Sequence, residues 1–518
     1  MRRGLLLLVP VLGVGIPGVA FGQQAPVETP PVLGLPPDSP QNGPIPGGVA
    51  PAYHRAQKDR NDWRFDFHGV LMVPVRASFA TREVVEEDQS KLVLHAPPVL
   101  PDYRDSFNYT GTVPQSYVKL LFSYGNPVVT GNISIVSEQP RTGSSFFDPP
   151  LNPGIEDAYL NFNLKDIMKN ARFDVNVGAF SNRYGVMGEY DEGRYATPII
   201  ARTNGIGESI TAGFAFDEWS LVLEQGFQGQ ADKPWNGITP DYSNDFADPK
   251  TGAGWVSHIH AGLGYKGLAT LGLHYMTVFT ADDRAIPASQ PDGRVDILGA
   301  DLRLTAGRYG HFYFGAAHHD VDHGRSLGRI VEILNVDSGL GLGAEYFGPD
   351  EQSETTGSLT TFAVQYDLSV SRLLWYPTPF VGEGPDLVFS VFGMQTHVSS
   401  LDKTLYPVEA NYDGKQYDGV VKRKFGLEAT YSLLSWFAVS ARGDYVAPDV
   451  DFTASSFSQI SPRLLFRTGW NAHDQVALQY SHFFNNNWTT VRGGFPLQND
   501  VKIVPDSDML ALTASMWW

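Results

Sequence analysis

The sequence predicts an all-β protein, a transmembrane antiparallel β-barrel of about 18 strands, with 16 strands as the alternative count. Three observations predict this fold class. Short segments alternate apolar and polar residues with period two along most of the chain, which is typical of strands with one apolar face. Many of these segments have roughly ten residues, the length at which a tilted strand crosses a bilayer. Long connections alternate with short ones, which indicates long outer loops and short periplasmic turns.

The N-terminal part of the chain divides into two segments that precede the barrel. Residues 1–22 have the pattern of a signal peptide, since Arg2 and Arg3 precede an apolar run and small residues lead up to Gly22. Residues 23–62 are rich in proline and poor in large apolar residues, so we expect a disordered periplasmic tail. The barrel itself is expected over residues 63–518.

The alternation gives an even number of candidate strands, which places both ends of the barrel in the periplasm. Residues 158–164 are a clear example, because Tyr159, Asn161 and Asn163 alternate with apolar neighbours. The segment 369–384 is the weak point of the count, since it is long for a periplasmic turn. The expected strands span 63–79, 115–124, 128–136, 155–165, 171–180, 206–216, 219–228, 255–265, 268–280, 293–305, 309–319, 358–368, 385–397, 420–431, 435–445, 461–470, 473–483 and 508–518.

Composition excludes several classes of function. The absence of cysteine excludes disulfide scaffolds, thiolate metal sites and cysteine nucleophiles. The formal net charge of -18 argues against nucleic acid as a partner, because binding phosphates requires a basic surface. Beyond the signal peptide, no stretch is apolar over about 18 residues, so we expect no transmembrane helix.

The C-terminal segment carries the most specific signal. Its apolar residues fall on one face of the last strand and end in an aromatic residue; they are Leu510, Leu512, Ala514, Met516 and Trp518. This pattern resembles the C-terminal signature by which the barrel-assembly machinery recognises Gram-negative outer-membrane barrels. With the signal peptide and the alternating strands, the chain resembles the porin group as an architectural pattern over residues 63–518. Residues 178–185 also look like the strand-to-loop segment of several porins.

The resemblance implies a protein of the Gram-negative outer membrane that contacts lipid and lets small solutes or ions through. A barrel of this size encloses an aqueous lumen, and strand parity predicts its lining, which includes both signs of charge. The resemblance leaves open whether three barrels associate as a homotrimer. The expected inward residues are Lys119, Asn161, Asn163, Asp174, Asn176, Glu224, Asp301, Arg303, Glu428, Arg442, Arg463, Arg467 and Gln479. The expected lipid-facing residues include Leu160, Phe162, Val175, Leu271, Leu273, Phe362, Phe425, Leu427, Leu464, Phe466 and Leu478.

The longest connection, 320–357, is expected to narrow the lumen. Its residues Leu327, Ile330, Val331 and Leu334 have helical spacing and would form one apolar stripe. A helix this short needs an apolar surface, and the inner barrel wall could provide one. The narrowest point would then lie near Arg325, Arg329 and Glu332. Two alternatives stay open: the segment packs on neighbouring outer loops, or the region around Leu340 to Phe347 forms irregular strand.

A cluster of histidines and aspartates offers the best candidate for a metal or catalytic site. His318, His319, Asp320, Asp322 and His323 lie within six residues at the expected outer end of a strand. Imidazoles and carboxylates can bind a divalent metal or activate water. A hydrated polar loop is the simpler interpretation of the same residues and is favoured. His260 and His274 are expected to face each other across a hairpin that turns at Lys266 and Gly267.

Taken together, the residues predict a passive outer-membrane channel for small hydrophilic solutes or ions, with no catalysis and no cofactor. Acidic residues in the expected outer loops indicate a mild preference for cations. Two other functions remain open. The barrel could be non-conducting and display its loops for adhesion, or it could carry a hydrolase site at its rim.

Overall fold

The computed structural model describes the strands of the barrel and several of the turns between them. No helix among these residues is both long and apolar enough to span a membrane. The described residues are 63–78, 117–126, 128–138, 154–164, 171–186, 198–230, 254–266, 268–280, 293–322, 331–332, 357–375, 384–400, 419–447, 450, 457–469, 474–485, 491–492, 495–496 and 506–518.

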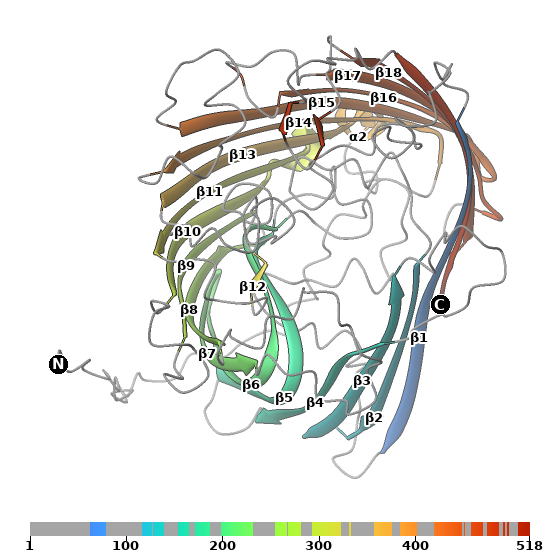
Figure 1. The fold of residues 1–518 in the computed structure, drawn as a ribbon. Coiled ribbons are helices and arrows are strands. Elements are labelled where there is room, and N and C mark those ends of the chain that lie inside the picture. The colour runs from blue at the N-terminus through green and yellow to red at the C-terminus, as the bar shows by residue number, and fades with distance from the viewer. Residues whose placement is uncertain are drawn as a thin grey trace, which may run out of the picture.

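Eighteen antiparallel strands form a closed ring, seen along its axis in Figure 1. Each strand pairs with the next one along the barrel, as the alternating sequence predicts. They are β1 (Arg64–Ser78), β2 (Tyr117–Gly125), β3 (Val129–Glu138), β4 (Gly154–Leu164), β5 (Ala171–Val186), β6 (Pro198–Phe216), β7 (Trp219–Gln230), β8 (Gly254–Tyr265), β9 (Ala269–Thr280), β10 (Arg294–Thr305), β11 (His311–Asp322), β13 (Gly357–Ser369), β14 (Asp386–Ser400), β15 (Gly419–Leu434), β16 (Phe437–Ala447), β17 (Phe457–Phe466), β18 (Asp474–Asn485) and β21 (Ser507–Trp517).

The ring closes between its first and last strands. Strand β1 pairs with β2 on one edge and with β21 on the other, where Val70 lies opposite Trp517 and Ser78 lies opposite Met509. This closure leaves no unpaired strand edge, which a barrel needs in lipid because hydrocarbon cannot satisfy backbone hydrogen bonds.

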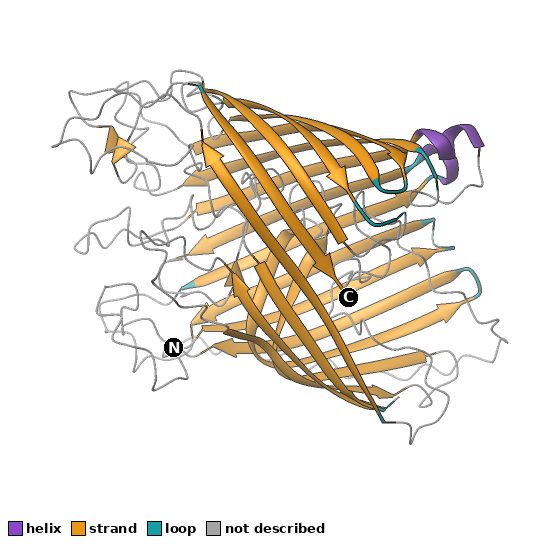
Figure 2. Ribbon diagram, turned by 90° about the vertical axis from the view of Figure 1, so that its right-hand side faces the viewer, coloured by secondary structure: helices purple, strands orange, loops and turns teal. Residues whose placement is uncertain are grey.

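Short turns and small helices gather at one end of the barrel (Figure 2). The β6–β7 turn contains Asp217 and the β8–β9 turn contains Lys266, and both residues have positive φ angles of 53° and 49°, as tight hairpin turns require. Lys266 and Glu218 form an ion pair between these turns, and this hydrogen bond lowers the pKa of the Glu218 carboxyl. The helix α2 (Val370–Trp375) and the 3₁₀-helix η1 (Gly307–Tyr309) lie at the same end.

The outer face of the ring is apolar, as a membrane-spanning barrel requires. Leu273, Phe362 and Phe425 each keep about half of their surface exposed there, at 52%, 57% and 53%. Aromatic residues border this belt at the short-turn end, where the Trp219 and Tyr265 rings lie 4.6 Å apart. Towards the long connections the outward positions become polar, with Glu208, Asp296, His318, His397 and Arg423. The belt is therefore bordered by aromatic residues at the short-turn end and by polar residues at the end with the long connections.

The expected fold class is confirmed, and every expected strand exists, but the bounds of three strands, β5, β6 and β17, differ by four residues or more. Strand β17 begins and ends four residues earlier than predicted, because the alternation around Pro462 continues into the flanking residues. Strands β5 and β6 extend far into the segment that the sequence predicts as a loop. The doubtful segment 369–384 contains α2, whose first turn is held by the Asp386 carboxylate, which accepts from the Ser371 N–H at 2.9 Å.

Candidate channel lumen

The inner face of the ring carries polar side chains of three kinds, arranged in separate sectors. The first sector, on β4 to β6, is built from amides, hydroxyls and one ion pair. The Asn161 amide donates to Asn176 at 2.8 Å, and the Asn176 amide donates to Ser209 at 3.1 Å. Beside them, Arg172 pairs with the Asp174 carboxylate. This sector is close to neutral and offers both donors and acceptors.

The second sector, on β7 to β10, is a row of carboxylates and histidines. His258 donates to Glu224 at 2.9 Å, and both side chains are almost fully buried. The Nδ1 atoms of His260 and His274 lie 3.1 Å apart, and His274 donates to Asp301 at 3.2 Å. The predicted pairing of His260 with His274 across their hairpin is therefore correct.

Glycine makes room for this row. A Cβ atom at Gly226 would overlap the His258 imidazole, and a Cβ atom at Gly272 would overlap the Asp301 carboxylate. The missing side chains let imidazole and carboxylate lie flat against the neighbouring strand and reach their partners. Because its members are buried and paired with one another, the row belongs to the packed wall.

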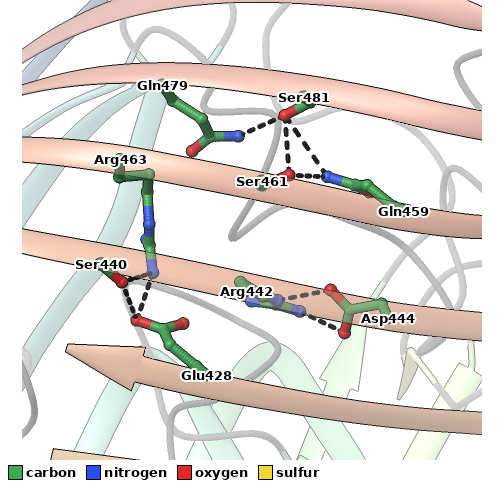
Figure 3. Close-up of polar contacts among 9 residues, drawn as sticks. All are labelled: Glu428, Ser440, Arg442, Asp444, Gln459, Ser461, Arg463, Gln479 and Ser481. Atoms are coloured by element: carbon green, nitrogen blue, oxygen red, sulfur yellow. Dashed lines mark hydrogen bonds and ion pairs between the residues drawn. The ribbon is translucent and has the colours of Figure 1, made fainter.

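The third sector, on β15 to β18, carries most of the described inward cations (Figure 3). Arg442 donates to both oxygens of Asp444, at 2.7 and 3.2 Å. Arg463 forms an ion pair with Glu428 and donates to Ser440 at 3.1 Å. Side-chain hydrogen bonds link Gln459, Ser461, Ser481 and Gln479 next to them. Paired charges of both signs therefore line this wall.

Two further inward arginines are described, Arg467 at the end of β17 and Arg303 on β10. The Arg467 guanidinium donates to Ser432 at 3.1 Å. The Arg303 guanidinium lies 5.4 Å from the centre of the Tyr313 ring, on the inner face of β10 and β11. All residues that were expected to face inward, and whose side chains are described, therefore lie on the inner face. Lys119 occupies an inward register position, opposite Val70 and Val136.

A hairpin extension of β5 and β6 lies inside the ring and reaches the inner face of β9 to β11, which the sequence did not predict at this place. We call this extension the inner ribbon, comprising residues 180–186 and 198–205. Ala179 and Ile206 pair with each other, and they are the last residues that pair with β4 and β7 respectively. Beyond them the two strands pair chiefly with each other and leave the wall (Figure 1).

Glycines permit this departure. Gly178 has a φ angle of 138°, which L-residues with side chains rarely adopt, and a Cβ atom there would overlap the backbone of β4. Gly205 and Gly207 occupy corresponding positions on β6, where a Cβ atom at Gly207 would overlap the backbone of Phe227. Close backbone approach at these positions explains why small residues stand where the ribbon bends.

The tip of the inner ribbon is attached to the inner face of β10 and β11. The buried His319 imidazole of β11 donates from Nε2 to the Ile200 carbonyl oxygen at 2.7 Å. The Ile200 side chain is fully buried and fills the space above Gly299 of β10. Near the base of the ribbon, the Gln228 amide donates to the Phe180 carbonyl oxygen at 3.0 Å.

The wall near the ribbon tip is apolar on its inner face. The residues involved are buried and belong to β8 to β10: Val256, Met276, Val278, Val295 and Ile297. An inner apolar patch of this kind is what an inserted segment needs for packing. The described segment beside this patch is the inner ribbon. The sequence predicted a helix from the connection 320–357 in this role.

The connection 320–357 also reaches this region, though not as the predicted helix. Val331 and Glu332 form the short strand β12, which pairs with Thr203 and Arg202 of the inner ribbon and lies inside the ring in Figure 1. The helical interpretation of Val331 is therefore wrong, because the ribbon edge offers backbone partners that a strand can use. Arg325 and Arg329 lie outside the described residues.

The predicted histidine and aspartate cluster does not converge. Strand alternation sends His318, Asp320 and Asp322 to the outer face of β11, and it sends His319 to the inner face. His318 contacts the Thr360 hydroxyl at 2.9 Å, whereas His319 binds the ribbon. Among the described residues, no group of three or more His, Asp or Glu residues is placed to hold a metal ion. His323 lies outside the described residues.

Comparisons with known proteins yield similarity of structure alone. No protein-family model matches the chain, and no curated protein matches it. Similar solved structures include OccK8 (OprE) of Pseudomonas aeruginosa, at a TM-score of 0.39 and 11% identity, covering 88% of this chain and 98% of that one. OccK11 (OpdR) of the same organism has a TM-score of 0.37 and 9% identity, covering 88% and 96%.

OmpT, an outer membrane protein of Vibrio cholerae, has a TM-score of 0.36 and 8% identity, covering 90% of this chain and all of that one. The expected architecture, 18 antiparallel strands in one closed sheet, is confirmed by the strand pairing of this chain itself. Because sequence identity and structural similarity to these proteins are so low, the function of this chain has to be argued from its own residues.

Proposed function

We propose that this protein is an outer-membrane porin, a passive aqueous channel for small hydrophilic solutes or ions. Residues 1–22 direct its export as a signal peptide, residues 23–62 form a periplasmic tail, and β21 is the strand that the barrel-assembly machinery recognises. The channel needs no cofactor and performs no catalysis, because concentration gradients drive the flux.

One observation carries the proposal: the wall has an apolar outer face and a charged, hydrogen-bonded inner face. A barrel that only displays loops needs the apolar outer face but has no use for an inner face of this composition. Arg463 and Glu428, whose side chains are 16% and 15% exposed, place both signs of charge on the inner face, whereas the Arg442–Asp444 pair, at 1% and 0%, belongs to the packed wall. Partly exposed charges such as Arg463 and Glu428 keep water and hydrated solutes in a lumen that would be dry if apolar residues lined it.

The inner ribbon supports a channel with a narrowed lumen. It leaves the wall at Ala179 and Ile206 and reaches β10 and β11 on the other side of the sector formed by β7 to β9. Solutes would therefore pass between the ribbon and the charged wall of β15 to β18. This geometry favours small solutes. It also strengthens the effect of the wall charges on which solutes pass, because electric fields act strongly across a narrow polar passage.

Purified protein in a planar bilayer tests the proposal. We expect discrete, reproducible conductance steps in potassium chloride, and we expect the steps to disappear when the protein is heat-denatured before addition. Circular dichroism and heat-modifiable migration on a gel verify that the sample is folded. A folded barrel that leaves the bilayer silent would refute the channel and favour a display function.

A further inference from the structure

We propose that the amide sector of β4 to β6 is a binding subsite for a neutral, polyhydroxylated solute such as a mono- or disaccharide. The inference rests on the proposed channel function and names the class of solute that this part of the wall recognises. The subsite consists of Asn161, Asn163, Asp174, Asn176 and the ring of Tyr159.

The first step is that polar atoms of this sector lack partners although they are buried. Within the described chain, neither the Nδ2 nor the Oδ1 atom of Asn163 makes a hydrogen bond, although the residue is only 3% exposed. The Oδ1 atoms of Asn161 and Asp174 are in the same situation. Buried polar groups are nearly always hydrogen-bonded, so a concentration of exceptions indicates that something else binds there.

The second step is that these atoms are neighbours. Asn163 lies directly opposite Asp174 on the adjacent strand, and Asn161 lies opposite Asn176 one row further on. All four belong to the inner face. The cluster therefore presents one donor and three acceptors within two adjacent rows of the sheet, at the periplasmic ends of β4 and β5.

The third step concerns the chemistry that fits them. A hydroxyl group donates one hydrogen bond and accepts others, so adjacent hydroxyls can satisfy the Asn163 donor and the neighbouring acceptors together. The Asp174 carboxylate is already paired with Arg172. The sector therefore has no net charge that would favour an anion or a cation, which points to a neutral ligand.

The fourth step is the aromatic neighbour. Tyr159 lies on the same face of β4, two positions from Asn161, and its ring packs edge-on against Phe180 at a centroid distance of 6.0 Å. An aromatic face beside amides and a carboxylate suits a sugar, since a sugar presents C–H groups on one side and hydroxyls around its edge. Phe180 begins the inner ribbon, so the subsite runs from the point where the ribbon leaves the wall, at Tyr159, to the periplasmic end of β4, at Asn163.

Titration of maltose into the folded full chain in detergent, followed by calorimetry, tests the inference. We expect saturable binding that is about three- to tenfold weaker in Asn163→Leu, since this isosteric change removes the hydrogen-bonding atoms. The matched control is Asn132→Leu, which removes an inward amide of β3 whose oxygen already accepts from Ser123 at 2.8 Å. A polyethylene glycol of similar mass, which carries few hydroxyl groups, should give no saturable heat.

The outcomes separate the subsite from the channel. Absence of saturable maltose binding, or equal loss in Asn163→Leu and Asn132→Leu, would overturn the subsite even if the barrel conducts ions. Saturable binding by a barrel that is silent in a bilayer would support the subsite and refute the channel. If Asn163→Leu fails to fold, Asn161→Leu is measured in its place, with the same expected weakening.

Discussion

Gly69 and Trp518 exchange two backbone hydrogen bonds of 3.1 Å, and the Trp518 indole covers the position where Gly69 has no side chain. The Trp518 ring also lies 5.6 Å from the Phe67 ring, and the backbone carbonyl oxygen of Trp518 accepts a hydrogen bond from His68 at 3.2 Å. The last residue of the barrel is therefore fitted into its first strand. This contact joins the two ends of the ring at the short-turn side.

The first prediction is that Gly69→Ala weakens the seam, by which we mean the pairing of β1 with β21. An added Cβ atom overlaps the indole and displaces it, and overpacking of this kind costs about 1–3 kcal/mol. We expect a lower temperature for the heat-modifiable gel transition. Gly131→Ala is the matched control, because a Cβ atom there meets Leu160 at an ordinary 3.6 Å. Equal transitions for the two variants would mean that the indole does not support the seam.

The second prediction concerns the attachment of the inner ribbon. His319→Leu removes the donor to the Ile200 carbonyl oxygen, and a buried acceptor left without a donor costs about 1–3 kcal/mol. We expect the ribbon tip to detach, which raises the mean single-channel conductance and its fluctuations. His318→Leu, on the outer face of the same strand, should leave both unchanged. The prediction would be wrong if the two variants conduct alike.

The third prediction concerns the long connection that follows β11. Deletion of residues 326–337 removes β12 from the edge of the inner ribbon. We expect a larger single-channel conductance, because Val331 and Glu332 of the deleted segment pair with the ribbon inside the ring. A folded deletion variant with unchanged conductance would place the rest of this connection away from the pathway.

The fourth prediction concerns ion selectivity at the charged wall of β15 to β18. Glu428→Gln removes the carboxylate that pairs with Arg463, so the arginine then attracts mobile anions. We expect the reversal potential in a salt gradient to shift towards anions. Glu208→Gln is the control, since Glu208 lies on the outer face opposite Val177 and Phe227. A shift of the same size in the control would indicate a general charge effect and not a local one.

The fifth prediction concerns ionic strength. Acidic side chains near an outer mouth enrich cations within a Debye length, about 10 Å at 0.1 M salt. We therefore expect a mild cation preference in the unmodified protein that fades as salt rises. Anion preference at low salt would contradict this and assign control of selectivity to Arg303, Arg442, Arg463 and Arg467.

Strand existence and orientation could be predicted from the sequence because they depend on local alternation. Residues such as Asn161, Phe362 and Arg442 lie on the predicted faces, since one shifted position would turn every side chain of a strand to the wrong side. The same alternation could not show which polar side chains form pairs. Pairs such as His258 with Glu224 depend on the register between strands, which was predicted only for the hairpin that brings His260 opposite His274.

The inner ribbon was missed because strand periodicity carries no information about where a strand leaves its sheet. The usable signal was the group of glycines at Gly178, Gly205 and Gly207, together with the apolar pair Ile199 and Ile200 in a segment that was expected to be a polar loop. Helical spacing around Val331 was the wrong guide. A short segment takes the conformation that its neighbours satisfy, and here the neighbour is a strand edge.

The pairing of β1 with β21 has a consequence for biosynthesis. His68 and Trp518 are 450 positions apart in the chain, yet they meet at the seam. Contacts of such long sequence separation form slowly, and this one requires almost the whole barrel sequence to have left the ribosome. Until then, the strands already synthesised keep their apolar faces exposed to aggregation. A cell that makes this protein must therefore protect the unfinished chain from aggregation, because the ring closes only when β21 pairs with β1.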